Sequence, residues 1–372
     1  MSQMSYGKVV LSFFLNTTII GAMASVAVAE DINGFNITNY GIGEFAGWAT
    51  AGGVQILTGD FNNDGRTDVA LLRQSPGWTT MPVAFANGNG TWQITNYSID
   101  DFASWATTSG VQILTGDFNN DGSTDVALLR QNAGWTTMPV AFANGNGTWQ
   151  ITNYSIGDFA SWATAGGVRP LTGDFNNDGR TDVALLRQSA GWTTMPVAFA
   201  NGNGTWQITN YSIDEFAGWA TAGGVRPLTG DFNNDGSTDI ALLRQNAGWT
   251  TMPVAFANGN GTWQITNYSI GEFAGWATAG GVRPLTGDFN NDGSTDVALL
   301  RQSPGWTTMP VAFANGNGTW QITNYSIGDF AGWATASGVR SLTGDFNNDN
   351  RTDVLLLRQN AGWTTMPIAF PQ

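Results

Sequence analysis

The pattern of hydrophobic and polar positions along this chain predicts short antiparallel strands. Asp68–Gln74 is apolar on both faces, which is typical of a strand that is buried on both sides. A strand is predicted before it at Val54–Phe61, and another after it at Thr79–Ala86, with the large apolar side chains on one face. Thr91–Ser98 alternates polar with apolar residues, as expected for an exposed edge strand. The pattern therefore indicates a sheet of four strands.

The segments between these strands carry turn signals that predict an antiparallel order. The Asn-Gly-Asn-Gly segment at 87–90 predicts a hairpin, because Asn and Gly accept the positive φ that tight hairpins require. A second turn is expected at 75–78, and a linker at Asp101–Ala106 leads to the next unit. Pro82 has no N–H to donate, so a bulge or an unpaired position is expected within the third strand.

The four-strand unit recurs six times with a period of 57 residues, and residues 30–372 hold these six periods. Repetition at a fixed period of this length indicates a repeat architecture. Four antiparallel strands per unit, arranged radially, form the blade of a β-propeller. The sequence thus predicts an all-β fold, with one six-bladed β-propeller over residues 30–372.

The two ends of the sequence carry further expectations. Residues 1–29 contain one Lys, an apolar stretch with a polar break and a small-residue end, which predicts a cleaved signal peptide, a secreted or periplasmic protein and no membrane span. Residues 35–40 align with the fourth strand at 92–97, whereas residues 366–370 form a third strand that no fourth strand follows. We expect the N-terminal strand to pair in the last blade and close the ring.

The composition narrows the possible functions. The chain has 14 basic and 28 acidic residues, a formal net charge of −14, and neither His nor Cys. Such a surface is a poor partner for nucleic acid or anionic lipid. The absence of His and Cys removes the usual general base and the thiol nucleophile, so we do not expect an enzyme.

One loop in each unit has the chemistry of a calcium site. In the first unit, Asp60, Asn62, Asp64 and Asp68 occupy loop positions 1, 3, 5 and 9, with a glycine at position 6. Calcium takes six to eight oxygen ligands in flexible geometry, so the pattern predicts bound Ca²⁺. The alternative is an Asx-rich turn without metal. In the sixth loop Asn350 replaces the glycine, which leaves occupancy of that loop open. The candidate ligands are Asp60, Asn62, Asp64, Asp68, Asp117, Asn119, Asp121, Asp125, Asp174, Asn176, Asp178, Asp182, Asp231, Asn233, Asp235, Asp239, Asp288, Asn290, Asp292, Asp296, Asp345, Asn347, Asp349 and Asp353.

These residues carry a resemblance to known repeat proteins. The Asp-x-Asn-x-Asp-Gly-x-x-Asp loop with its apolar strand resembles the FG-GAP or VCBS-type repeats of integrin α-chain propellers and of many bacterial secreted proteins. The order Asn-Gly-Asn-Gly-Thr-Trp, Asp-Phe-Ala-Gly-Trp, Val-Arg-Pro and Gly-Asp-Phe-Asn-Asn-Asp-Gly is similar to the calcium-containing propeller lectins of the Psathyrella velutina type. That resemblance implies sugar pockets between blades and partners that contain N-acetylglucosamine. Those lectins have seven blades, whereas six are expected here.

Connections in an antiparallel blade alternate between the two strand ends. The calcium loops and Asn-Gly-Asn-Gly turns are therefore expected on one face, and the linkers and Gly-Trp turns on the other. The second face would collect two Trp and one or two Arg per unit, and Trp beside Arg suits a sugar. The candidate ligand-binding residues are Trp48, Arg73, Trp78, Trp105, Arg130, Trp135, Trp162, Arg169, Arg187, Trp192, Trp219, Arg226, Arg244, Trp249, Trp276, Arg283, Arg301, Trp306, Trp333, Arg340, Arg358 and Trp363.

Each of these residue types has a structural alternative. The tryptophans can pack between blades, and packing is the favoured role for Trp92 on the outer strand. The Arg73 side chain can form an ion pair or cap loop carbonyls. Gln55 and Gln112 stand where later units have Arg169 and its equivalents, so the first two blades are expected to bind differently or not at all.

The leading hypothesis is a secreted, calcium-stabilised lectin with up to six related sugar sites, because several weak sites gain avidity on a glycan-covered surface. The alternative is an adhesion propeller that binds a surface protein with the same face. A glycan array in calcium buffer separates the two.

Overall fold

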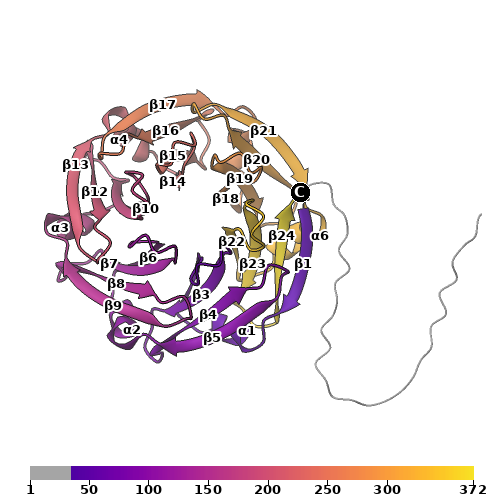
Figure 1. Ribbon diagram of the computed structural model, residues 1–372. Helices are drawn as coiled ribbons and strands as arrows, with labels where there is room; N and C mark the ends of the chain where they lie inside the picture. Colours follow the sequence, from indigo (N-terminus) through magenta and orange to yellow (C-terminus); the bar gives the residue numbers. More distant parts are fainter. Residues whose placement is uncertain (1–34) are drawn as a thin grey trace, which may run out of the picture.

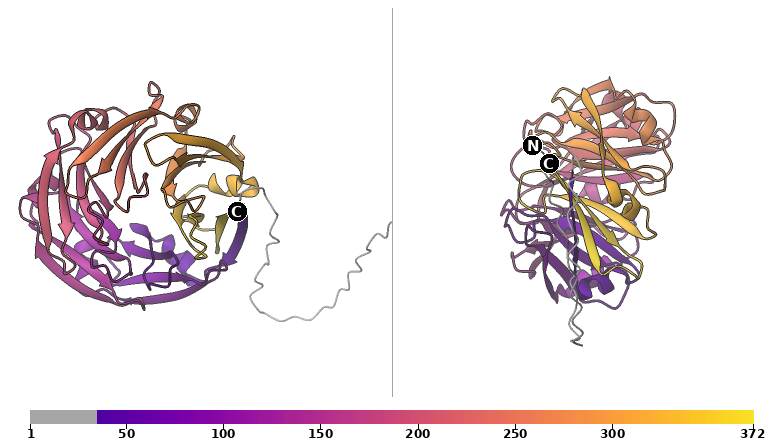
Figure 2. Two further views of the ribbon diagram at one scale, coloured as in Figure 1. Left: turned by 45° about the horizontal axis from the view of Figure 1, so that its top comes forward. Right: turned by 90° about the vertical axis from the view of Figure 1, so that its right-hand side faces the viewer.

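The computed structural model describes residues 35–372, so the predicted signal peptide lies outside the described residues. Figure 1 shows six sheets around a common axis, each of four antiparallel strands. The six-bladed propeller predicted from the repeat is therefore confirmed. Figure 2 shows the same ring tilted and from its side. Within the described residues, no helix has the length and apolar character needed to cross a membrane.

Each blade runs from an inner strand near the axis to an outer strand on the circumference (Figure 1). From inner to outer strand, blade 1 is β2 (Val54–Gly59), β3 (Asp68–Arg73), β4 (Thr80–Ala86) and β5 (Trp92–Ser98). Blade 2 is β6 (Val111–Gly116), β7 (Asp125–Arg130), β8 (Thr137–Ala143) and β9 (Trp149–Ser155), and blade 3 is β10 (Val168–Gly173), β11 (Asp182–Arg187), β12 (Thr194–Ala200) and β13 (Trp206–Ser212). Blade 4 is β14 (Val225–Gly230), β15 (Asp239–Arg244), β16 (Thr251–Ala257) and β17 (Trp263–Ser269), and blade 5 is β18 (Val282–Gly287), β19 (Asp296–Arg301), β20 (Thr308–Ala314) and β21 (Trp320–Ser326). Blade 6 is β22 (Val339–Gly344), β23 (Asp353–Arg358), β24 (Thr365–Pro371) and β1 (Phe35–Gly41).

The segments expected as linkers are short helices. They are α1 (Glu44–Ala49), α2 (Asp100–Ala106), α3 (Asp158–Ala163), α4 (Asp214–Ala220), α5 (Phe273–Ala277) and α6 (Gly328–Ala334). In α2, Phe102, Ala103 and Ala106 are buried, a spacing that places them on one helical face. Two carboxylates in its first turn suit the positive end of the helix dipole. Helix formation there is a correction to the sequence analysis, caused by the apolar face that each linker buries.

The third strand of each blade has an interrupted ladder, as its proline predicts. Only two residue pairs join β3 to β4, Val69 with Ala84 and Ala70 with Val83. Pro82 is the next residue of β4, and it pairs only with Asn96 of β5 on the other side. Because proline cannot donate to a ladder, the pairing with β3 ends there.

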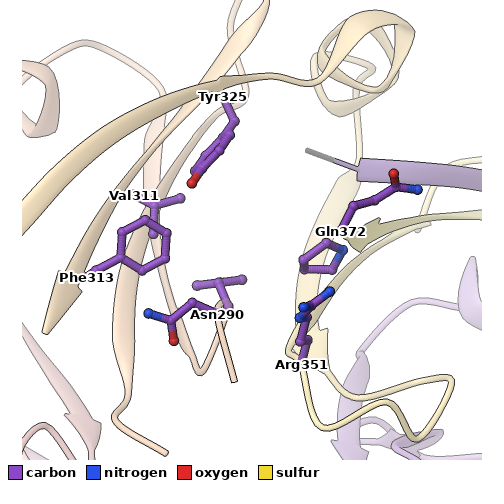
Figure 3. Close-up of a pocket in the computed structure, with 8 residues that line it drawn as sticks. Asn290, Val311, Phe313, Tyr325, Arg351 and Gln372 are labelled. Carbon is purple, nitrogen blue, oxygen red and sulfur yellow. The ribbon is translucent and has the colours of Figure 1, made fainter. Parts of the chain in front are cut away.

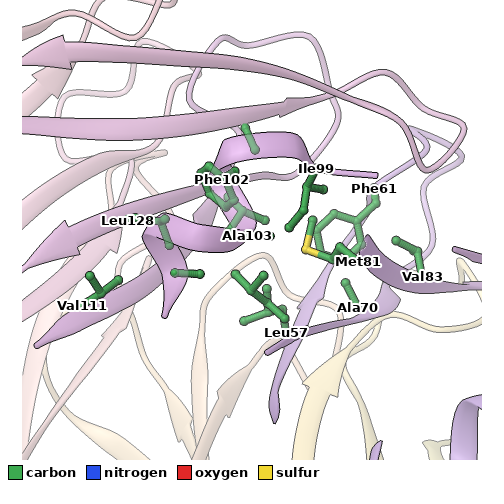
Figure 4. Close-up of a cluster of buried hydrophobic side chains, with 14 of the residues drawn as sticks. Leu57, Phe61, Ala70, Met81, Val83, Ile99, Phe102, Ala103, Val111 and Leu128 are labelled. Carbon is green, nitrogen blue, oxygen red and sulfur yellow. The ribbon is translucent and has the colours of Figure 1, made fainter. Parts of the chain in front are cut away.

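The core lies between neighbouring blades rather than within one. Figure 4 shows the cluster between blades 1 and 2, where Leu57, Phe61 and Met81 of blade 1 meet Val111 and Leu128 of blade 2. The buried face of α2 adds to the same cluster, so each helix packs into an interface between blades. Five equivalent clusters follow around the ring, listed by their helix phenylalanines as Phe159, Phe216, Phe273, Phe330 and Phe45.

The ring closes as predicted, through strand β1. It pairs along its whole length with β24, from Phe35 opposite Pro371 to Gly41 opposite Thr365. A second set of bonds links the inner parts of the blades. Gln74 Nε2 donates to the Val111 carbonyl of the next blade at 2.9 Å, and the equivalent bond from Gln359 to the Val54 carbonyl, at 3.0 Å, completes the circle.

The outer-strand tryptophans pack between blades, as expected for Trp92. Its ring meets Phe346 of blade 6 edge to face at 5.9 Å between centroids. Trp149, Trp206, Trp263 and Trp320 make the same contact with the preceding blade, on Phe61, Phe118, Phe175 and Phe232 respectively. Such aromatic pairs add to the stability of the interface beyond the area they bury.

Candidate functional site

The disc has two chemically different faces. The loop face is defined by the Asp60–Thr67 loop and its repeats together with the Asn-Gly-Asn-Gly turns, and the helix face by helices α1–α6 with the Gly-Trp turns. Contacts support this division: Arg180 of a loop donates from Nε to the Ala200 carbonyl beside an Asn-Gly turn, at 2.7 Å. The predicted separation of the candidate metal ligands from the candidate sugar-binding residues is therefore present in the structure.

On the loop face, the first three predicted ligands of each loop lie together. Asp60 Oδ1 accepts from the backbone N–H of Asn62 and Asp64, and its Oδ2 accepts from Gly65 N–H at 2.8 Å. Asn62 Nδ2 donates to Asp64 Oδ2 at 3.1 Å. Gly65 has a φ of 81°, a left-handed conformation that glycine adopts at little cost. The loop geometry is therefore held by its own Asx hydrogen bonds.

The sixth loop keeps this geometry despite its different residue. Asn350 has a φ of 65°, and its N–H donates to Asp345 Oδ2 at 2.9 Å, the same bond that Gly65 makes. Asparagine tolerates the left-handed region better than other residues with a side chain. The substitution therefore leaves the loop fold unchanged.

Asp68, at loop position 9, is fully buried, and both of its carboxylate oxygens accept hydrogen bonds from backbone N–H groups. Its Oδ2 accepts from Phe61 N–H and its Oδ1 from Ala86 N–H, both at 2.9 Å, so it ties the loop to the end of β4. Burial raises the pKa of Asp68 to about 8, against the effect of the two backbone bonds. In blade 6 the residue equivalent to Ala86 is Pro371, which has no N–H, and Asp353 Oδ1 has no hydrogen-bond partner among residues 35–372. Burial raises the pKa of Asp353 to about 9.

The donor set of each loop suits a hard cation by its chemistry, because every candidate ligand atom is a carboxylate or amide oxygen. Within residues 35–372, however, no three acidic side chains are gathered in the arrangement of a metal centre. The carboxylates accept backbone N–H bonds instead. Sequence reasoning also missed Asn63, which takes a φ of 55° and donates from Nδ2 to the Asp121 carbonyl of the next loop at 3.0 Å.

On the helix face, the Arg73 side chain is a structural cap. Its Nε donates to the Gly52 carbonyl at 3.0 Å and to Ser75 Oγ at 2.9 Å. The guanidinium also lies 5.7 Å from the centroid of the Trp78 ring, a cation–π contact that recurs in all six blades at 5.4 to 5.8 Å. The carbonyl-capping role considered for Arg73 is therefore present, and it holds the tryptophan in place.

The turn tryptophan and the following helix tryptophan share a cleft. Trp306 of the β19–β20 turn and Trp333 of α6 line a hollow of about 570 Å³, with Asp329 and Thr335 on its wall. Both rings are half-buried, so one side packs on the core and the other faces the hollow. By the repeat, the equivalent pairs are Trp78 with Trp105, Trp135 with Trp162, Trp192 with Trp219, Trp249 with Trp276, and Trp363 with Trp48.

Two further hollows border this face and the rim. Trp219 also lines a cleft of about 490 Å³ with the outer-strand Trp263, beside Asp214 and Glu215. Of these residues, sequence reasoning placed only Trp219 at a candidate site, and it missed Trp263, Asp214 and Glu215. Arg226 and Arg283 lie away from the tryptophans, in a separate cleft of about 570 Å³ near the axis. The inner-strand arginines are thus distinct from the Trp cleft, although Thr335 borders both hollows.

A smaller cavity of about 130 Å³ lies where blades 5 and 6 meet, and Figure 3 shows Phe313 and Tyr325 facing Arg351 and Gln372 across it. Phe289 forms part of its wall, yet within the described residues it has no tryptophan partner of the kind seen in the other five interfaces. The sequence position equivalent to that tryptophan in blade 6 is Phe35. The sequence of blade 6 thus differs from that of the other blades at this interface.

Comparisons with known proteins agree with this architecture. A family model described as an FG-GAP-like repeat matches residues 60–128, 117–185, 174–242, 231–299 and 288–356. A solved structure of an Agrocybe aegerita lectin, described as recognising non-reducing terminal N-acetylglucosamine, is similar at 21% identity with a TM-score of 0.57. The likeness covers 86% of this chain and 80% of that one, and it shows a shared fold. No curated protein sequence matches the chain.

Proposed function

Because this chain belongs to the FG-GAP-like repeat family and folds as a six-bladed propeller, we propose that it is a secreted, calcium-binding, multivalent glycan-binding protein. The function is binding rather than catalysis. The glycan sites are the Trp clefts of the helix face, and the metal sites are the six loops of the loop face.

The cleft shared by Trp306 and Trp333 carries the proposal. A flat indole face covers the C–H groups of a sugar, while Asp329 and Thr335 on the cleft wall offer polar partners for its hydroxyls. Arg301 holds the Trp306 ring through a cation–π contact at 5.6 Å, so the platform is ordered before a ligand arrives. Six such clefts on one face suit a surface that displays many copies of one glycan.

The lectin of similar fold gives the first ligand to test. It is described as recognising non-reducing terminal N-acetylglucosamine. Glycans that end in N-acetylglucosamine are therefore the expected partners of the Trp clefts.

Calcium would be held by the Asp60, Asn62 and Asp64 oxygens, with Asp68 behind them, and by the equivalent groups of the other loops. A bound divalent cation would supply the positive charge that offsets three neighbouring carboxylates. The chain's own contribution is to hold those oxygens on one side of a turn, through the backbone N–H bonds to Asp60.

A glycan array in calcium buffer tests the proposal, with binding to terminal N-acetylglucosamine as the expected result. Quenching or a shift of tryptophan emission on titration of the free sugar should accompany it. A protein that binds no glycan on the array but captures a surface protein would contradict the lectin assignment and favour an adhesion propeller.

A further inference from the structure

The second residue of each inner strand divides the ring into two parts. Blades 1 and 2 have Gln55 and Gln112, whereas blades 3 to 6 have arginine. All six side chains are exposed, and the inner strands surround the axis (Figure 1). We call the four arginines the arginine arc; they are Arg169, Arg226, Arg283 and Arg340.

The arc places like charges near one another without counter-ions. Arg226 and Arg283 line one cleft. Partial burial, followed by the charges of Arg340 and Arg226, lowers the pKa of Arg283. Within the described residues the two ion pairs are Arg66 with Asp64 and Arg180 with Asp178, both on the loop face. No arginine of the arc has a carboxylate partner in residues 35–372, although acidic residues outnumber basic ones two to one in the chain.

Each of the last three guanidiniums is held by one nitrogen only. Arg340 donates from Nε to Gln359 Oε1 at 2.9 Å, and Gln359 Nε2 is itself anchored on the Val54 carbonyl of the next blade. Arg226 and Arg283 make the same Nε bond to Gln245 and Gln302. Their Nη groups donate to no acceptor in the described residues. The arrangement therefore fixes the direction of each guanidinium and leaves its outer N–H groups available.

The space beside the arc is large enough for a ligand with several charged groups. Arg226, Arg283, Gln245 and Gln302 line the cleft of about 570 Å³, together with the chain at 278–282 and 334–339. None of its lining residues is Asp or Glu. The lining is thus cationic and amide-rich, which suits an anion and excludes a metal ion.

We propose that the arginine arc binds a ligand with several oxyanion groups, such as sulfates, phosphates or carboxylates. A guanidinium presents parallel N–H donors that match two oxygens of such a group, and these charge-assisted bonds are strong. Guanidiniums on consecutive blades bind successive oxyanions of one ligand. The site does not depend on the proposed glycan clefts, which use the tryptophans. The ligand's source is either a free polyanion or an acidic polysaccharide.

The chain supplies its own matched substitution for a test. Arg169→Gln, Arg226→Gln, Arg283→Gln and Arg340→Gln in one variant place in blades 3 to 6 the residue that blades 1 and 2 already have. Inorganic tripolyphosphate and dextran sulfate are titrated by calorimetry at low and at physiological ionic strength, with neutral dextran as the reference. The wild type should bind the anions more weakly as salt rises, and the variant should lose on the order of 100-fold in affinity.

Two controls separate this site from general charge effects and from glycan binding. Arg283→Gln and Arg351→Gln each remove one positive charge, but only the first lies in the arc, so only the first should weaken anion binding. The quadruple variant should keep its melting temperature and any array binding to neutral glycans. Tighter binding of tripolyphosphate points to a free polyanion, and tighter binding of dextran sulfate to a polysaccharide. A wild type that binds neither anion, or a quadruple variant that binds both equally well, would overturn the proposal.

Discussion

The loop face and the helix face are built from the same repeat, but they differ in whether their polar groups find hydrogen-bond partners within the protein. On the loop face, Asp60 and Asp68 have nearly every oxygen satisfied by backbone N–H groups, and Asp68 is fully buried. On the helix face, Trp306 and Trp333 remain half-exposed, and the outer nitrogens of Arg226, Arg283 and Arg340 have no acceptor within the part of the chain that the structure describes. Changes on the loop face should therefore act mainly on stability, whereas changes on the helix face should act mainly on binding.

The largest loss of stability is expected from removal of strand β1, which completes blade 6 and so supports both faces. Deletion of residues 30–41 removes β1 and leaves β24 as an unpaired edge, so the chain should lose its cooperative melting transition and aggregate. Deletion of residues 1–34 is the matched control, because it leaves β1 in place. Differential scanning calorimetry and size-exclusion chromatography compare the two. A 30–41 deletion that melts like the control and stays monodisperse would show that β1 is dispensable.

The second-largest change in stability should come from calcium, which we expect to bind on the loop face alone. A ligand that binds only the folded state stabilises it by about 2.7 kcal/mol per site at a hundredfold excess over Kd, so six sites should raise the melting temperature by many degrees. Chelator should reverse the rise. Asp121→Ala should lower the calcium stoichiometry by about one, whereas Asp101→Ala, an acidic residue in helix α2, should not. An unchanged melting curve after verified metal removal would argue against the metal sites.

A smaller loss of stability should come from single buried aspartates, and its size should depend on the blade. Asp125→Ala leaves the N–H groups of Phe118 and Ala143 without their acceptors. Asp353→Ala frees only Phe346 N–H, because Pro371 offers none. Each unsatisfied donor costs about 1–3 kcal/mol, so the Asp125 variant should be the less stable of the two in chemical denaturation. Equal losses would mean that the bonds to Ala143 and its equivalents contribute nothing.

The smallest effect on stability, and the largest on binding, should follow from changes to the helix face. Replacement of the turn tryptophans by Ala should remove about 1–3 kcal/mol of affinity at each site, by analogy with base stacking on aromatic rings. All six must change together, because avidity masks a single loss; they are Trp78, Trp135, Trp192, Trp249, Trp306 and Trp363. Trp149→Ala is the converse control, since Trp149 packs on Phe61 and should lower stability more than binding. A folded sextuple variant that still binds the same glycans would remove these residues from the site.

The sequence was sufficient for the blades, the closure by β1 and the division into two faces, because each rests on a local pattern that recurs. Alternation of apolar residues, Asn-Gly turns and a fixed period are visible without knowledge of contacts. The helices were missed because α2 has seven residues, fewer than two full turns, and its pattern is too short to stand out in a linker.

Several contacts between residues distant in sequence were beyond sequence reasoning for a different physical reason. One partner of Asp68 is the backbone N–H of Ala86 in the same blade, a group that no side-chain pattern identifies. The pairing of Trp306 with Trp333, and the separation of Arg283 from both, depend on how strands from different repeats meet. Such contacts join residues that are distant in sequence, so a local pattern does not encode them.

The pairing of β1 with β24 also determines where this ring can be opened. In blade 6 no hairpin joins the third and fourth strands, whereas a hairpin joins them in every other blade. An Asn-Gly-Asn-Gly-Thr linker from Pro371 to Phe35, like the five residues between Ala86 and Trp92, would therefore make the backbone continuous there. New termini could then be placed at any of the other five hairpins. Circular permutants of this kind should keep the same ring. The blade that combines strands from both ends of the chain would then lie at a new position relative to the four arginines.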